Sequence, residues 1–219
     1  MSRSFIVAID GAAASGKGTL AKRLAAHFDF AYLDSGSLYR AIGVAVLRAG
    51  GDPTDEAAAV AAARTLDLSQ FTAEDLRTEA AASAASQVAA IPAVRAAILQ
   101  FQRDFAHHPP QGKKGAVLDG RDIGTVVCPD AQAKIFVSAS LDVRVERRIK
   151  ELRAKGEVVI EARVRADLMA RDARDSSRAV APMKPADDAW PLDTSALDAD
   201  QVFDLVKKFV ADKIAHHSG

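Results

Sequence analysis

The sequence predicts a three-layer α/β/α fold around a five-stranded parallel sheet. Several short apolar runs are rich in β-branched residues and show no polar alternation, as expected of strands buried on both faces. These runs alternate with segments of helical periodicity, which is the order typical of a parallel α/β sheet. A chain of 219 residues with 49% hydrophobic residues is large enough for one such domain with a small insertion.

The expected elements of the first half of the chain follow from local spacing. The run FIVAI has no polar residue on either face, and Leu20, Leu24 and Phe28 repeat at helical spacing after it. Thr54 is of a residue type that caps helix N-termini, and Pro92 suits the first turn of a new helix. We therefore expect strand 4–9, helix 18–28, strand 30–34, helix 36–50, helix 54–66 and mostly helix over 72–106.

In the second half of the chain, Pro109 and Pro110 first break the helical pattern. The runs KGAVLDG and AKIFVSA then predict two more buried strands, and Gly156 is expected to end a helix. We therefore expect strand 114–120, strand 133–139, helix 141–156, helix 157–175, a weak strand 189–194 and helix 199–215.

The segment IDGAAASGKGT lies between the first predicted strand and the first predicted helix. Its glycines and small residues let backbone N–H groups close around an anion, the helix N-terminus adds a positive dipole end, and Lys17 adds a fixed charge. This is the pattern of a phosphate-binding P-loop, except that Gly18 stands between Lys17 and Thr19. The alternative is a glycine turn that only caps the helix. The predicted phosphate-binding residues are Gly11, Ala12, Ala13, Ala14, Ser15, Gly16, Lys17, Gly18 and Thr19.

Lysine and arginine concentrate in one region of a chain whose formal net charge is zero. Residues 144–178 hold eleven Lys or Arg against seven Asp or Glu. Arg171, Arg174 and Arg178 fall at i, i+3 and i+7, on one face of a predicted helix. Because guanidinium groups bind phosphate oxygens in pairs, the region suits a highly anionic ligand. The alternative is a solvated face on which these arginines pair with the aspartates between them.

Four further segments follow the glycine-rich loop along the chain: YLDSGSLYR (32–40), ASAASQVAAIPAVR (82–95), LDGRDIGTVVCPDA (118–131) and RDARDSSRAVAP (171–182). Together with the loop at 11–19, they resemble the bacterial cytidylate kinases over nearly the whole chain. DGRDIGT and RDARDSSRAVAP are the specific parts, since many unrelated enzymes share a P-loop. The resemblance implies transfer of the γ-phosphate of ATP to CMP or dCMP, giving ADP and CDP or dCDP, with Mg²⁺ as cofactor.

The resemblance also implies roles for single residues at the CMP end. Three arginines are expected to hold the CMP phosphate, with Ser35 beside it, and Asp122 is expected to accept from the amino group that uracil lacks. Arg171 and Asp175 are expected as a pair near the ribose. The implied CMP-binding residues are Ser35, Arg40, Ser86, Arg95, Arg121, Asp122, Arg171, Asp175 and Arg178.

At the ATP end, the resemblance assigns Arg144 and Arg148 to ATP, because they share a face of the helix predicted at 141–156. Asp119 and Thr19 are implied to hold Mg²⁺, partly through water, with Asp34 a weaker candidate. The expected alternatives are that Asp34 and Ser35 only cap a helix and that Asp122 only pairs with Arg121. The residues expected to act on the transferred group are Lys17, Arg121, Arg174 and Arg178.

The resemblance divides the chain into one P-loop kinase unit of the P-loop NTPase type. It places the core at 1–50, 111–155 and 180–219, a mostly helical nucleoside-monophosphate-binding insert at 51–110, and a helical, arginine-rich lid at 156–179. The family usually carries a longer insert with a small β-rich piece. Here residues 66–89 run almost directly into the helix that bears Ser86, so we expect a shortened insert.

Composition argues against several other classes of protein. The balanced charge and the absence of a basic tract speak against a nucleic-acid partner, and no apolar run approaches the length of a membrane span. The single cysteine, Cys128, fits a reducing cytosol. We therefore expect a cytoplasmic monomer that binds ATP and CMP or dCMP, with no nucleic-acid or membrane partner.

Three other functions stay open from the sequence alone. One is a P-loop kinase for another acceptor, such as UMP, AMP or shikimate. A second is a regulator that binds nucleotides without transferring phosphate, and a third is a nucleic-acid-binding ATPase. Asp122, Ser86 and Arg95 favour cytosine over the other acceptors.

Overall fold

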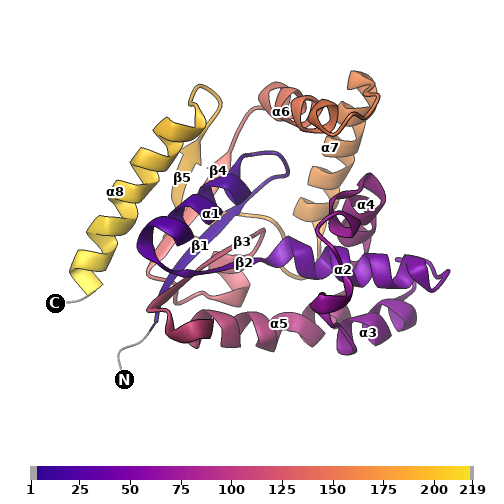
Figure 1. The fold of residues 1–219 in the computed structure, drawn as a ribbon, viewed down its shortest axis with the longest axis horizontal. Coiled ribbons are helices and arrows are strands. Elements are labelled where there is room, and N and C mark those ends of the chain that lie inside the picture. The colour runs from indigo at the N-terminus through magenta and orange to yellow at the C-terminus, as the bar shows by residue number, and fades with distance from the viewer. Residues whose placement is uncertain (1–3, 218–219) are drawn as a thin grey trace.

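The computed structural model describes residues 4–217, and their centre is a five-stranded sheet (Figure 1). All neighbouring strands are parallel, in the order β2-β3-β1-β4-β5. The strands are β1 (Phe5–Gly11), β2 (Ala31–Asp34), β3 (Gly115–Gly120), β4 (Ala133–Ser138) and β5 (Trp190–Asp193). The predicted parallel sheet, with its five strands in their predicted places, is confirmed.

The central strand β1 explains why the sequence shows apolar runs without alternation. Val7 and Ile9 face a cluster that includes Leu24 of α1 and Val206 of α8. On the other side, Ile6 and Ala8 join a cluster formed with β2, β3 and α5. Because every residue of β1 is buried, both alternating sets of side chains must be apolar, apart from the acid near its end.

Eight α-helices surround the sheet within residues 4–217. They are α1 (Lys17–Phe28), α2 (Ser35–Arg48), α3 (Glu56–Arg64), α4 (Glu79–Val88), α5 (Pro92–His107), α6 (Leu141–Ala154), α7 (Glu161–Ser177) and α8 (Ala199–His217). Every predicted helix is present, and Pro92 opens α5 as predicted. The helices α1 and α8 pack on one face of the sheet and α5 on the other, which gives the three layers (Figure 1).

Two local predictions are wrong. The N-cap of α3 is Asp55 and not Thr54, because the Asp55 carboxylate accepts from the N–H groups of Ala57 and Ala58 at 2.8 and 3.2 Å. Arg178 lies just past the end of α7 with extended backbone (φ −57°, ψ 134°), so it does not continue the helical face of Arg171 and Arg174. Arg178 and Arg171 nevertheless line the same cavity, which is described below.

Residues 51–110 contain helices and no strand, all of them described by the structure. Their apolar residues pack against one another and against α2, in a cluster that includes Leu38, Ile42, Ala59 and Val88. The helices α6 and α7 form a separate small cluster, which reaches the phosphate loop at Ala13. Figure 1 shows α6 and α7 at the top of the view, with α4 and α2 below them.

No single helix in residues 4–217 is long and apolar enough to cross a membrane. The stretches Glu79–Val88 and Pro92–Gly112 reach that length and composition only when taken together, and the chain bends by 100° between them.

Candidate active site

The loop between β1 and α1 has the backbone shape of an anion nest. Gly11 has φ 149°, and a Cβ added to it would lie 2.0 Å from the carbonyl oxygen of Val137, so only glycine fits. Ala14 (φ 59°) and Gly16 (φ 91°) are both left-handed. Gly16 is the N-cap of α1 and offers no side-chain cap, which leaves the first N–H groups of the helix available to a phosphate.

Two arginines of α6 hold this loop through hydrogen bonds to its carbonyl groups. Arg144 donates to the carbonyl of Ala13 at 3.4 Å, and Arg147 donates to the carbonyl of Ser15 at 3.1 Å. Arg147 also donates to the hydroxyl of Thr194 at 3.0 Å, and that hydroxyl lies 3.2 Å from the same Ser15 carbonyl. The carbonyl groups of Ala13 and Ser15 therefore already accept hydrogen bonds from side chains. The sequence paired Arg144 with Arg148 and missed Arg147, which the i, i+3 spacing from Arg144 could have indicated.

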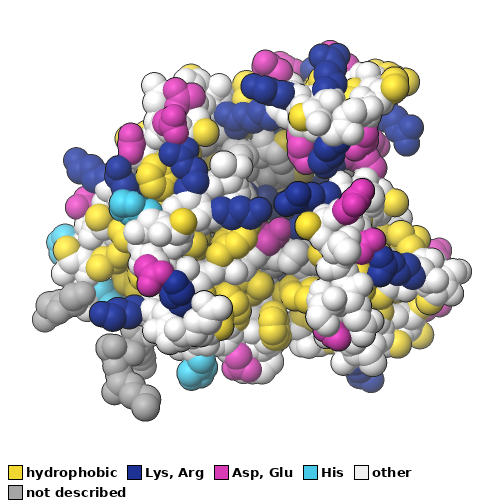
Figure 2. Space-filling view, viewed as in Figure 1, with side chains coloured by type: hydrophobic (Ala, Val, Ile, Leu, Met, Phe, Trp, Pro, Cys, Tyr) yellow, Lys and Arg dark blue, Asp and Glu magenta, His cyan; other side chains and the backbone are white. Residues whose placement is uncertain are grey.

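The cavity at the end of β1 and β3 has a volume of about 200 Å³. It is lined by all the residues that the sequence assigned to CMP, which come from segments far apart in the chain: Ser35, Arg40, Ser86, Arg95, Arg121, Asp122, Arg171, Asp175 and Arg178. Lys17, Ala13 and Ala14 of the phosphate loop line the same cavity. Figure 2 shows Lys and Arg side chains gathered around the hollow on this face.

The ion pairs in this cavity differ from those that the sequence suggested. Asp122 pairs with Arg95 and not with Arg121, and both side chains are nearly closed to solvent (7% and 8% exposed). Asp175 pairs with Arg178, and it also accepts from Arg121 Nε at 2.9 Å. Local spacing could not predict the pairs of Asp122 with Arg95 and of Asp175 with Arg121, because each joins segments that only the fold brings together. The pair of Asp175 with Arg178 is local, at i, i+3, as the alternative of arginines paired with nearby aspartates allowed.

Two guanidinium groups in the cavity keep an unused donor. The Nε atoms of Arg171 and Arg178 are buried and have no hydrogen-bond partner within the described residues. Burial, together with the nearby charge of Arg121, lowers the pKa of Arg171 to about 10. A buried donor without an acceptor is costly, so these atoms fit a site that an anion completes.

Lys17 faces the same cavity from the start of α1. Burial, and then the charge of Arg121, lower the pKa of its amino group to about 7, against the opposing effect of Asp119. The amine is therefore held beside other cations, and negative charge that enters the cavity favours its charged form.

Asp119 near the end of β3 lies close to the phosphate loop and lines the cavity. Its Oδ2 accepts from the hydroxyl of Tyr32 at 2.6 Å, and a Cβ on Gly18 would lie 3.5 Å from the same oxygen. Burial raises the pKa of Asp119, and Lys17 lowers it. Asp34 instead caps α2 at Ser37 N and pairs with Arg40.

No group of three or more His, Cys, Asp or Glu gathers into a metal cluster within residues 4–217. A single carboxylate still suits Mg²⁺, which takes most of its ligands from water and substrate phosphates. Thr19 is exposed and lines neither cavity, whereas Asp119 lines the cavity of the arginines. Of the two residues predicted to hold the metal, Asp119 thus lines the cavity where phosphates are expected, and Thr19 does not line it.

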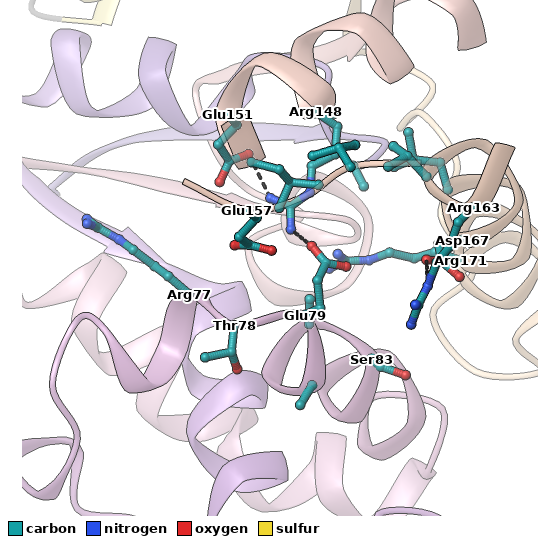
Figure 3. Close-up of a pocket in the computed structure, with 18 of the residues that line it drawn as sticks. Arg77, Thr78, Glu79, Ser83, Arg148, Glu151, Glu157, Arg163, Asp167 and Arg171 are labelled. Carbon is teal, nitrogen blue, oxygen red and sulfur yellow. Dashed lines mark hydrogen bonds and ion pairs between the residues drawn. The ribbon is translucent and has the colours of Figure 1, made fainter. Parts of the chain in front are cut away.

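A second, larger cavity of about 800 Å³ lies between α4 on one side and α6 and α7 on the other. Arg148 projects from α6 into this cavity and pairs with Glu79 of α4 and with Glu151 (Figure 3). Arg174 donates from Nε to the hydroxyl of Ser86 at 3.1 Å. Arg148 and Arg174 therefore join α6 and α7 to α4, whereas Arg144, one turn earlier on α6, pairs with Asp172 of α7.

Sequence reasoning missed three further residues around these cavities. Tyr39 lines the smaller cavity, and the guanidinium of Arg95 lies 5.3 Å from its ring centre. Tyr32 holds Asp119, as described above. Asp10 accepts from two backbone N–H groups next to Asp122, and burial raises its pKa to about 7. Both tyrosines lie in YLDSGSLYR, whose resemblance was the available signal; for Asp10 the sequence gave no signal beyond an acid in an apolar strand.

Comparisons with known proteins found similarities that extend over most of the chain. A family model described as cytidylate kinase matches residues 7–212. The cytidylate kinase of Rhodospirillum rubrum is 60% identical over 208 residues, which are 95% of this chain and 98% of that protein. The cytidylate kinase of Paramagnetospirillum magneticum is 62% identical over 200 residues, 91% of this chain and 94% of that protein. Because both relatives are covered almost completely, neither carries a long segment that this chain lacks.

Solved structures with low sequence identity share the fold. An uncharacterized protein from Eubacterium ventriosum matches with a TM-score of 0.55 at 16% identity, over 94% of this chain and 98% of that chain. A sugar kinase from Janibacter sp. HTCC2649 matches with a TM-score of 0.50 at 12% identity, over 95% of each chain. At such identities the likeness concerns the α/β fold alone.

Proposed function

The chain belongs to the cytidylate kinase family, and from that premise we propose how its residues carry out the transfer of the γ-phosphate of ATP to CMP, which gives ADP and CDP. One observation supports the assignment most directly. The nine residues expected to bind CMP line a single cavity, and Lys17 of the phosphate loop lines it too. Acceptor and donor phosphates can therefore meet in one place.

At the CMP end, Arg40, Arg121 and Arg178 hold the phosphate of CMP. The buried, unpartnered Nε of Arg178 supports this role, because a phosphate oxygen supplies the acceptor that it lacks. Asp122, oriented by Arg95, accepts from the amino group of cytosine. UMP presents a carbonyl at that position, so binding UMP leaves a buried carboxylate facing an oxygen.

At the ATP end, the backbone of the loop from Gly11 to Gly16 surrounds the phosphates. Arg144 and Arg147 support this by occupying the loop carbonyls of Ala13 and Ser15. Lys17 places its amino group between the two nucleotides. Phosphoryl transfer depends mainly on positioning and on neutralising charge, so Lys17, Arg121, Arg174 and Arg178 stabilise the charge that spreads over the moving group.

No residue is needed as a strong general base. The attacking atom is a phosphate oxygen of CMP, and a phosphate monoester is already largely ionised at pH 7 because its second pKa is about 6. The chain therefore has to align this oxygen and exclude water rather than remove a proton. The helical segment 156–179 is suited to cover the cleft, since Arg174 reaches across it to Ser86.

Mg²⁺ fits the donor set beside the phosphate loop. Asp119, positioned by Tyr32 and close to Gly18, is the residue that holds the ion, through water or directly. The ion, when bound, supplies positive charge to the phosphate oxygens of ATP. Thr19, whose side chain is exposed, stays a second predicted residue for the ion.

The proposal extends to dCMP as a second acceptor. Asp175, the expected ribose residue, already accepts from Arg121 and Arg178, so its oxygens are engaged before any sugar hydroxyl arrives. A site whose ribose contact is already satisfied loses little when the 2′-hydroxyl is missing. The nine residues expected to bind CMP line one cavity within a single chain, so the proposed site needs no residue from a second copy.

An acceptor screen tests the function. Purified protein with MgATP is offered CMP, dCMP, UMP and AMP separately, and ADP release is followed by a coupled assay. We expect CMP to give the highest kcat/KM, dCMP to follow, and UMP and AMP to be at least about tenfold poorer, the scale of one unsatisfied buried group. The Lys17→Met variant serves as the inactive control. A clear preference for UMP or AMP, or no ADP release with CMP, contradicts the proposal.

A further inference from the structure

The segment that follows β3 carries two residues of the CMP site and then forms a short π-helical turn, Ile123–Val127. Arg121 and Asp122 stand directly before it, and Asp122 occupies its N-cap position with φ −145° and ψ 23°. The orientation of this turn therefore sets where the Asp122 carboxylate points.

An aspartate at an N-cap normally accepts a hydrogen bond from a backbone N–H of the helix that it begins. Asp122 does not: its side chain makes no cap bond and instead pairs with Arg95 in the smaller cavity. Asp122 therefore pairs with Arg95 rather than capping the turn that it precedes. The first N–H groups of the turn need another acceptor, because they are buried.

Asp10 supplies that acceptor from the central strand. Its Oδ1 accepts from the N–H of Ile123 and its Oδ2 from the N–H of Gly124, both at 2.8 Å. Asp10 is 5% exposed, and in the sheet register it stands beside Gly120, the last residue of β3. One carboxylate thus takes both N–H groups that Asp122 leaves.

Arg103 of α5 holds the other end of the same turn. Its Nε donates to the carbonyl of Val127 at 3.1 Å, and its terminal nitrogen donates to the carbonyl of Val126 at 3.0 Å. The turn is therefore fixed at its N-terminus by an acid and at its C-terminus by a guanidinium. Neither Asp10 nor Arg103 lines either cavity.

We infer that Asp10 and Arg103 are positioning residues for cytosine recognition: Asp10 caps the Ile123–Val127 turn in place of Asp122, and this leaves the Asp122 carboxylate free to face the base. The inference rests on the proposed function and deepens it. Asp10 also directly precedes Gly11, so the strand that ends in the ATP loop orients the residue that reads CMP.

The Asp10→Asn variant tests this role with little change in volume. An amide has one acceptor oxygen, so its NH₂ group must face a backbone N–H and one bond is lost. Asp122 is then drawn back toward its own helix. We expect the ratio of kcat/KM for CMP to that for UMP to fall by about tenfold, mainly through a higher KM for CMP, with the KM for ATP changed by less than about twofold.

The specificity ratio separates positioning from general damage. A variant that merely loosens the fold lowers kcat/KM for CMP and UMP together, whereas a misdirected Asp122 lowers only the value for CMP. The same substitution in an Asp122→Asn background should leave the ratio unchanged within about twofold, because the group being positioned is already gone.

Gln132→Leu provides a matched control, because Gln132 lies just before β4 and its side chain contacts the same strand, β1. The Gln132 side chain accepts from the N–H of Ile6 at 2.7 Å, near the opposite end of β1. Its loss removes a side-chain acceptor from β1 without touching the turn, so we expect an unchanged CMP-to-UMP ratio.

Arg103→Met decides the matter if Asp10→Asn does not fold. We expect this variant to lower the ratio by a smaller factor, about threefold, since it frees the end of the turn farther from Asp122. If Asp10→Asn folds and its ratio of kcat/KM for CMP to that for UMP is unchanged, the inference is overturned. If Asp10→Asn does not fold, an unchanged ratio in folded Arg103→Met overturns it. Failure of the wild-type protein to phosphorylate CMP refutes the proposed function instead, before any variant is compared.

Discussion

The charge on Lys17 is the residue-scale property most open to measurement. Burial and the neighbouring Arg121 lower its pKa to about 7, so at pH 8 the amine of the free protein is mostly neutral. ATP phosphates raise that pKa again. Binding of ATP at pH 8 should therefore take up about one proton through Lys17, whereas at pH 6 the amine is already charged and takes up none. Calorimetry in buffers of different ionisation enthalpy measures this uptake.

The Lys17→Arg variant is the matched control for proton uptake. A guanidinium stays charged at both pH values, so the difference between wild type and variant isolates Lys17 from the titration of ATP itself. An equal proton uptake by the two proteins at pH 8 shows that Lys17 is already charged in the free protein and contradicts the lowered pKa.

Single-residue partners were the part of the site that sequence predicted least well. The resemblance named residues that line one cavity, but it did not indicate that Asp175 pairs with Arg121. Asp122 pairs with Arg95, 27 residues away in the chain. Such choices depend on distances between side chains from separate elements, and no local pattern encodes them.

At the scale of elements, close packing of α4 on α2 places Ser86. A Cβ added to Gly43 of α2 would lie 2.7 Å from the Cβ of Ala84 in α4. Gly43→Val must push α4 outward, so we expect a loss of about 1–3 kcal/mol in the free energy of unfolding. The KM for CMP should rise because α4 carries Ser86, while the KM for ATP stays near the wild-type value. Urea unfolding and steady-state kinetics measure these effects.

Ala61→Val controls for the cost of a β-branched residue in a helix. Ala61 is exposed on α3, where added volume meets solvent. We expect its unfolding free energy to stay within about 0.5 kcal/mol of wild type. If Gly43→Val behaves like this control in both stability and KM for CMP, then α2 does not position α4.

The order of elements was predictable from the sequence because its signals are local. Apolar runs gave the strands, and Pro92 and the glycine-rich loop gave two helix starts. The N-cap of α3 was missed because Asp52 takes the N–H of Thr54 at 2.8 Å and moves the cap one residue on, to Asp55. Arg178 was misplaced on a helical face because spacing alone does not show where α7 ends.

At the scale of the whole molecule, the fold brings the two proposed nucleotide sites to the carboxyl ends of adjacent strands. The glycine-rich loop follows β1, and two of the residues that we propose to bind CMP follow β3, its neighbour in the sheet. Residues 51–110 supply Ser86 and Arg95, and α7 with the residue after it supplies Arg171, Asp175 and Arg178. Donor and acceptor therefore share one cationic cavity, and the central claim is that phosphate passes directly between them.

A labelling experiment tests that claim most directly. The protein is mixed with CMP, Mg²⁺ and ATP labelled at the γ-phosphate, and the products are separated after a single turnover. We predict that the label appears almost entirely in the β-phosphate of CDP and that little is released as inorganic phosphate. Label that accumulates as inorganic phosphate, or stays in ATP while both nucleotides are bound, would contradict direct transfer within the shared cavity.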